Sequence, residues 1–125
     1  YQPGQLWPVF PVATKKIDHL FDRNERLVFH LAHPNRNTES VISMIGAFGV
    51  GRMTTDWNPV ITNNNTPQQD FTINKTIQRG QEIGRFELGS TVVLFFEPNQ
   101  IAEWKVQSGQ KVRLGEGIAT FTAQA

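Results

Sequence analysis

The sequence contains no cysteine, which excludes disulfides and cysteine-ligated metals. It has no apolar run near the roughly 18 residues that a helix needs to cross a bilayer. An excess of charge of one sign is also missing. The formal net charge is +1, so no strong field attracts nucleic acid, and we expect no nucleic-acid partner. What is present is a chain of 125 residues with nine phenylalanines and three tryptophans, enough for one hydrophobic core.

Short apolar or alternating segments make up most of the chain, and turn-forming residues separate them about every ten positions. Residues 26–33 alternate in the manner of a half-buried strand, and residues 71–77 alternate as a short exposed strand. Residues 91–96 are apolar on both faces, which predicts a buried central strand. We therefore predict a mainly β fold: a flattened barrel or sandwich of about seven or eight short strands, in a single domain over residues 1–125.

Helical signals are sparse. Ile17, Leu20 and Phe21 have helical spacing and predict one or two short helical turns. Pro98 stands where the first turn of another helix would begin. Three prolines among the first eleven residues restrict that segment to an edge strand or an irregular lead-in.

Two groups of residues resemble functional sites without having the spacing that function requires. His19, His30 and His33 are not spaced as metal ligands with an acidic partner, so we predict no metal and interpret them as ordinary histidines. The glycines of residues 46–51 resemble a dinucleotide-binding loop but lack its spacing and the helix that should follow. We interpret them as glycines that let strands bend and pack closely.

Gly89 and Ser90 suggest a different chemistry, although a Gly-Ser pair by itself also fits an ordinary turn. A serine hydroxyl can attack the carbonyl before it, and glycine at that position has no Cβ to block the approach. The resulting ester can be eliminated and the new terminus hydrolysed to a pyruvoyl group. Such a carbonyl combines with an amine and withdraws electrons during decarboxylation, as pyridoxal phosphate does.

Several separate motifs resemble the C-terminal part of phosphatidylserine decarboxylases. Residues 79–98, RGQEIGRFELGSTVVLFFEP, resemble that family's cleavage region with its Leu-Gly-Ser-Thr motif. Four further segments resemble other parts of the family in the same order, and together they cover the whole chain: YQPGQLWPVF (1–10), LFDRNER (20–26), IGAFGVGRMTTDW (45–57) and KVRLGEGIA (111–119).

The resemblance implies that Ser90 is the self-cleavage nucleophile and the source of a covalent pyruvoyl cofactor, and that Gly89 ends the large chain. It implies an enzyme that converts phosphatidylserine to phosphatidylethanolamine and carbon dioxide. Such an enzyme would lie peripherally at a membrane, either the bacterial cytoplasmic membrane or the mitochondrial inner membrane.

The family's catalytic Asp and His precede the segment that begins here at Tyr1, and His19, His30 and His33 do not replace them. Because Tyr1 is not a methionine, we expect an upstream catalytic half or other subunits. Whether this chain is itself an enzyme stays open. The alternative is a catalytically inactive decarboxylase-like domain that serves as an accessory subunit of a membrane-associated complex. A third hypothesis, a carbohydrate-binding β sandwich, rests only on the three tryptophans, Trp7, Trp57 and Trp104.

Overall fold

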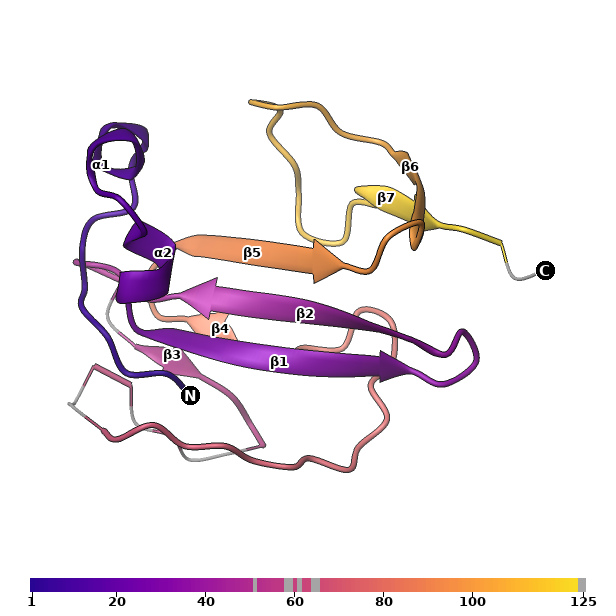
Figure 1. The fold of residues 1–125 in the computed structure, drawn as a ribbon, viewed down its shortest axis with the longest axis horizontal. Helices are drawn as coiled ribbons and strands as arrows, with labels where there is room; N and C mark the ends of the chain where they lie inside the picture. The colour runs from indigo at the N-terminus through magenta and orange to yellow at the C-terminus, as the bar shows by residue number, and fades with distance from the viewer. Residues whose placement is uncertain (51, 58–59, 61, 64–65, 124–125) are drawn as a thin grey trace. The chain divides into compact units, whose positions relative to one another are not determined.

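The computed structural model describes residues 1–50, 52–57, 60, 62–63 and 66–123, and every structural statement below concerns these residues. Two short helices and seven strands follow one another along this part of the chain (Figure 1). They are α1 (Pro11–Lys16), α2 (Leu20–Arg23), β1 (Arg26–His33), β2 (Thr38–Ile45), β3 (Met53–Thr54), β4 (Arg85–Phe86), β5 (Thr91–Phe96), β6 (Ile101–Trp104) and β7 (Ala119–Phe121). The prediction of a mainly β fold with short strands and one or two helical turns is confirmed.

The strands form three small sheets. One sheet has three strands in the order β1-β2-β5. β3 pairs antiparallel with β4, with Met53 opposite Phe86, and β6 pairs antiparallel with β7 around an irregularity between Ile101 and Glu103. The strand predicted over residues 26–33 is confirmed with the same bounds, because its alternating pattern places Leu27 on a buried face.

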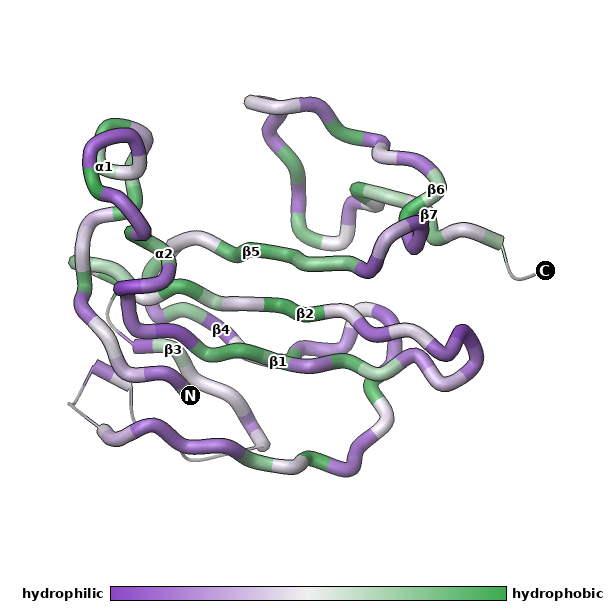
Figure 2. Tube along the Cα trace, in the orientation of Figure 1, coloured by the Kyte–Doolittle hydropathy of each residue, from purple (hydrophilic) through white to green (hydrophobic). Residues whose placement is uncertain are grey.

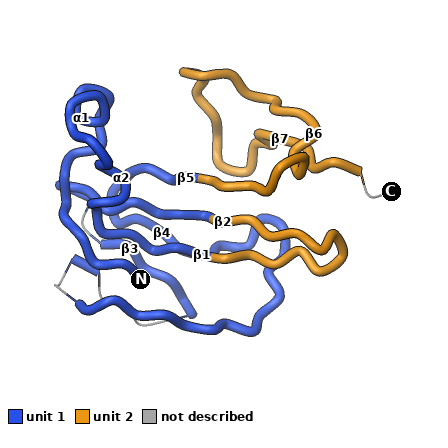
Figure 3. The backbone as a smooth tube through the Cα atoms, viewed as in Figure 1, with its two compact units in different colours: residues 1–29, 42–93 blue, residues 30–41, 94–125 orange. Residues whose placement is uncertain are grey.

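The chain divides into two compact units (Figure 3). Unit 1 comprises Tyr1–Phe29 and Ile42–Val93, and unit 2 comprises His30–Val41 and Leu94–Ala125. The expectation of a single domain stays a prediction.

The core of unit 1 lies between its first residues and strands β1 to β3. Tyr1, Leu27, Met44 and Met53 form a buried cluster, against which Phe29, Val60 and Phe86 pack. The apolar parts of these strands stand out in Figure 2. The candidate site adjoins this core, because Met44 of the core is followed by Ile45, the last residue of β2, whose carbonyl belongs to the site.

Aromatic packing organises unit 2. Phe96 makes edge-to-face contacts with Trp104 and Phe121, whose ring centroids lie 5.9 and 6.1 Å away. The Arg36 guanidinium lies 5.2 Å from the Phe121 ring centroid, a cation–π contact. His33 and Ser40 are hydrogen-bonded at 2.8 Å.

The prediction of a buried central strand over residues 91–96 is wrong. β5 has a single neighbour, β2, among the described strands, and it therefore forms an edge of its sheet. Val92 and Phe95 are 49% and 56% exposed, although Figure 2 shows the strand apolar along most of its length. The sequence of a strand shows whether both of its faces are apolar, but it does not show how many strands lie beside it.

Three other predictions of local structure are wrong. Residues 71–77 form no strand, and residues 98–100 form a turn that leads into β6 instead of a helix. The proline-rich lead-in contains α1, because Pro11 occupies the first helical turn, where the missing N–H costs nothing. The one or two helical turns predicted from Ile17, Leu20 and Phe21 are present as α2.

Candidate functional site around Gly89 and Ser90

The Gly89–Ser90 peptide lies in the loop that joins β4 to β5. Main-chain hydrogen bonds tie the start of this loop to the segment that follows β2. The Leu88 N–H donates to the Val50 carbonyl at 3.0 Å, and the Glu87 N–H donates to the Arg52 carbonyl at 2.9 Å. Leu88 and Gly89 themselves are exposed, and Ser90 is half-buried. Among the described residues, the Gly89–Ser90 peptide is therefore accessible from solvent, although the residues before it are fixed by hydrogen bonds.

The Ser90 side chain has one hydrogen-bond partner in the described structure. Its hydroxyl donates to the Ile45 carbonyl oxygen at 2.6 Å, and Ile45 is the last residue of β2 and almost fully buried. This bond fixes the orientation of Oγ. A carbonyl oxygen accepts the hydrogen bond without being able to take the proton away, so a base is still needed to remove it.

Gly89 has open space where a side chain would be. A Cβ built at this position meets no atom within 4 Å, and the backbone of Gly89 is not in the left-handed region. The glycine is therefore required neither by packing nor by backbone strain. Its remaining advantage is that nothing shields its carbonyl carbon from the neighbouring hydroxyl, which fits a bond that must be attacked by Ser90.

We expect Gly89→Ala to separate stability from chemistry. The variant should keep its melting temperature within about 2 °C, because the new methyl group meets no other atom. If Ser90 attacks the Gly89 carbonyl, cleavage should slow by about tenfold, because the methyl crowds the approach. The two quantities are measured by thermal unfolding and by following the chain on a denaturing gel. Unchanged cleavage together with unchanged stability would contradict this account of Gly89.

The glycine segment after β2 is explained by packing. Gly46 is buried, and a Cβ there would lie 3.1 Å from the Glu25 carbonyl oxygen and 3.3 Å from the Met53 methyl carbon. Gly49 has a φ of +83°, in a turn. The interpretation as a close-packing glycine is confirmed for Gly46, whereas Gly49 serves a turn and has open space beside it, and Gly51 lies outside the described residues.

A buried polar pair, Asn24 and Glu25, holds the end of β2 in place. The Asn24 side-chain amide donates to the Gly46 carbonyl at 2.8 Å, and the Gly46 N–H donates to the Glu25 carbonyl at 2.7 Å. Because Gly46 follows Ile45 directly, these bonds position the carbonyl that accepts from Ser90. The resemblance drew attention to this segment, but nothing in its spacing indicates that it supports the loop of Ser90.

The carboxylate of Glu25 is also fixed. It accepts hydrogen bonds from the Tyr1 hydroxyl at 2.7 Å and from the Asn63 N–H at 2.6 Å. Burial, and then the hydrogen bond to Glu25, raise the pKa of the Tyr1 phenol, so that Tyr1 stays a neutral donor. The first residue of the chain and the Asn24–Glu25 segment are thus locked together.

The three histidines do not assemble into a site in the described structure. His19 is exposed and lies 3.2 Å from Asp22, His30 is exposed on β1, and His33 bonds Ser40. No group of three metal-ligating side chains occurs in the described part of the chain. Nor is any helix found among the described residues that is long and apolar enough to cross a membrane.

Comparison with known proteins identifies the family of the chain. The family model of phosphatidylserine decarboxylase matches residues 1–120. This chain belongs to the phosphatidylserine decarboxylase family. Proteins of this family use a pyruvoyl group and are associated with membranes.

Individual phosphatidylserine decarboxylase proenzymes show the same similarity. The chain is 38% identical to the one from Anaeromyxobacter sp. (strain K), over 94% of this chain and 43% of that protein. It is 34% identical to the one from Brevibacillus brevis and 36% identical to the one from Myxococcus xanthus, each over 98% of this chain. The chain spans less than half the length of these relatives, at most 45%. No solved structure matches it.

Proposed function

We propose that this chain is the part of a phosphatidylserine decarboxylase that carries the self-cleavage site and, after cleavage, the pyruvoyl group. The observation that carries the proposal is the geometry of Gly89 and Ser90. An oriented hydroxyl, bonded to the Ile45 carbonyl at 2.6 Å, follows directly on an unshielded glycine carbonyl in an exposed loop. That loop lies within the segment that the family model covers.

In total, the proposed cleavage consumes one water molecule and releases one molecule of ammonia. Ser90 Oγ attacks the Gly89 carbonyl carbon, and the peptide bond becomes an ester. Loss of the Ser90 Cα proton then breaks the bond between Cβ and Oγ, so that Gly89 leaves as a carboxylate that keeps this oxygen. Hydrolysis of the residue left at position 90 releases its nitrogen as ammonia and leaves a pyruvoyl group at the start of residues 90–125.

The residues of this chain position the group and hold it on a rigid element. Thr91 begins β5 directly after position 90, so the group would stand at the end of a hydrogen-bonded strand. The open space beside Gly89 leaves room for a substrate amine. A pyruvoyl carbonyl supplies the electron sink for decarboxylation when it is present.

The base that cleavage needs would come from the remainder of a family-length protein. In the described part of the chain no histidine or carboxylate is hydrogen-bonded to Ser90. The resemblance supplies an Asp and a His upstream for this role. The substrate would be phosphatidylserine, at a bacterial cytoplasmic membrane or the mitochondrial inner membrane.

The proposal is tested by assaying the natural protein on phosphatidylserine vesicles. We expect phosphatidylethanolamine and carbon dioxide to form in equal amounts. Hydroxylamine, which captures reactive carbonyls, should stop the reaction, whereas metal chelators should not. A purified natural protein that leaves phosphatidylserine unchanged, or whose activity survives hydroxylamine, would contradict the proposal.

A further inference from the structure

We propose that residues 7–16, the irregular segment before α1 and α1 itself, form a surface that docks onto an anionic lipid bilayer. The observation behind this proposal is a group of apolar side chains that unit 1 leaves uncovered. Trp7, Phe10 and Val12 are 40%, 56% and 57% exposed, all within six residues. We call Trp7, Phe10, Val12, Lys15 and Lys16 the α1 patch.

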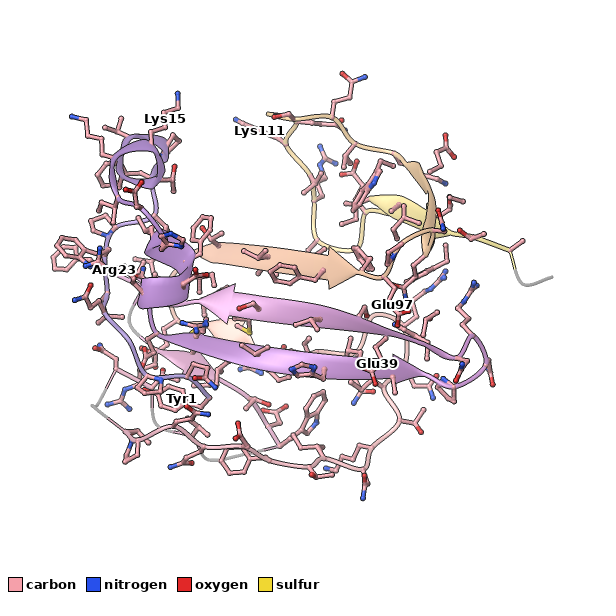
Figure 4. The ribbon with its side chains drawn as sticks, in the orientation of Figure 1. Tyr1, Lys15, Arg23, Glu39, Glu97 and Lys111 are labelled. Carbon is pink, nitrogen blue, oxygen red and sulfur yellow. The ribbon has the colours of Figure 1, made fainter. Side chains whose placement is uncertain are left out.

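The patch combines apolar and positive side chains. Lys15 and Lys16 lie in the last turn of α1 and are exposed, and Figure 4 shows Lys15 extending outward from the helix. No acidic residue occurs between Tyr1 and Ile17. Although the whole chain is nearly neutral, this segment is therefore locally cationic. Aromatic side chains flanked by lysines suit the boundary of a bilayer, where rings insert among head groups and ammonium groups meet anionic lipid.

The backbone beneath the patch is rigid. The buried Asn24 side chain binds both main-chain groups of Trp7: it accepts from the Trp7 N–H at 3.0 Å and donates to the Trp7 carbonyl at 2.8 Å. Ala13 turns inward from α1 and is buried, while its neighbours Val12 and Thr14 are exposed. The patch is thus presented by a fixed frame, which lowers the entropy that binding would cost.

Trp7 also has a cationic neighbour of its own. The Arg23 side chain comes from the end of α2 (Figure 4). Its guanidinium lies 5.8 Å from the Trp7 ring centroid. This cation–π contact places a third positive charge beside the exposed ring. Two acidic residues follow the patch: Asp18, which is exposed, and Asp22, whose carboxylate lies 3.2 Å from the His19 ring nitrogen.

The inference rests on the membrane association of the family and adds to the proposed function the surface that makes the contact. It commits to a lipid bilayer and not to protein. If the remainder of a family-length chain covered the patch instead, the side chains of the patch would not reach lipid. Replacing these side chains would then lower the stability of the protein.

Vesicle sedimentation with the natural protein tests the inference. The apolar variant Phe10→Ser/Val12→Ser should bind vesicles of phosphatidylcholine and phosphatidylglycerol, an anionic lipid that the proposed activity does not consume, about tenfold less tightly. The charge variant Lys15→Gln/Lys16→Gln should lose about fivefold per lysine on these vesicles, and nothing on pure phosphatidylcholine. The control, Phe71→Ser/Lys75→Gln, replaces an exposed aromatic residue and an exposed lysine outside the patch and should bind as the natural protein does.

A second readout follows Trp7 directly. Brominated lipids should quench part of the tryptophan fluorescence, and Trp7→Phe should remove that part while the melting temperature stays unchanged. The Ser90→Ala protein should bind vesicles normally, so failure of cleavage and failure of docking are distinguishable. Two results would overturn the inference: binding and quenching equal to the natural protein in all patch variants, or patch variants that bind normally but melt at a lower temperature.

Discussion

Ser90→Ala is expected to leave the natural protein as a single uncleaved chain without decarboxylase activity. The hydroxyl that bonds the Ile45 carbonyl is the only nucleophile at this peptide in the described structure, and alanine removes it. Stability should fall by only about 1 kcal/mol, since one hydrogen bond at a half-buried position is lost. Denaturing electrophoresis shows the chain length, and the phosphatidylserine assay shows the activity.

Ser108→Ala is the matched control for this result. Ser108 is an exposed serine in unit 2 that also neighbours a glycine, Gly109. Its replacement tests whether the loss of another serine beside a glycine also prevents cleavage. This control should be cleaved and active to the same extent as the natural protein. If the Ser90→Ala protein were still cleaved into two chains, the assignment of Ser90 as the nucleophile would be wrong.

Asn24→Ala is expected to cause the largest loss of stability, about 3 kcal/mol, which corresponds to a melting temperature lower by roughly 10 °C. Asn24 is fully buried, and its amide makes three hydrogen bonds, two with main-chain groups of Trp7 and one with the Gly46 carbonyl. Alanine leaves the buried Gly46 carbonyl and the two partly buried main-chain groups of Trp7 without these hydrogen bonds. Urea unfolding measures the effect.

The same variant should also impair cleavage and vesicle binding together, because Asn24 supports both Gly46 and Trp7. Asn74→Ala, at an exposed position in an irregular segment, should change stability by less than about 0.5 kcal/mol and leave both activities intact. An Asn24→Ala protein as stable as this control would show that the polar pair does not hold the end of β2.

Features of the fold that depend on nearby residues could be predicted from the sequence, whereas features that depend on distant strands could not. The alternation in residues 26–33 marked β1 with its exact bounds, because a strand with one buried face has a period of two. Pro11 could begin α1 because the constraint of its ring is local, although the neighbouring prolines masked this signal. The position of β5 at a sheet edge depends on which strands lie beside it, and no property of residues 91–96 encodes that.

The candidate site shows the same limit. Gly89 and Ser90 could be selected from the sequence, because the chemistry of adjacent residues needs no tertiary information. The roles of Asn24, Glu25 and Ile45 could not, because the hydrogen bonds of Asn24 to Gly46 and of Ser90 to Ile45 span 22 and 45 positions and use main-chain carbonyls that any residue carries. The resemblance to a family identified the Asn24–Glu25 segment, and only the structure connects it to the end of β2.

The central claim is that Ser90 becomes a pyruvoyl group, and the intact mass of the natural protein under denaturing conditions tests it most directly. The account predicts two species. The smaller should begin at position 90 and be lighter than a fragment with an ordinary N-terminal serine by the mass of one ammonia. A single species with an intact Gly89–Ser90 bond would contradict the account, and would favour a decarboxylase-like domain that serves as an accessory subunit.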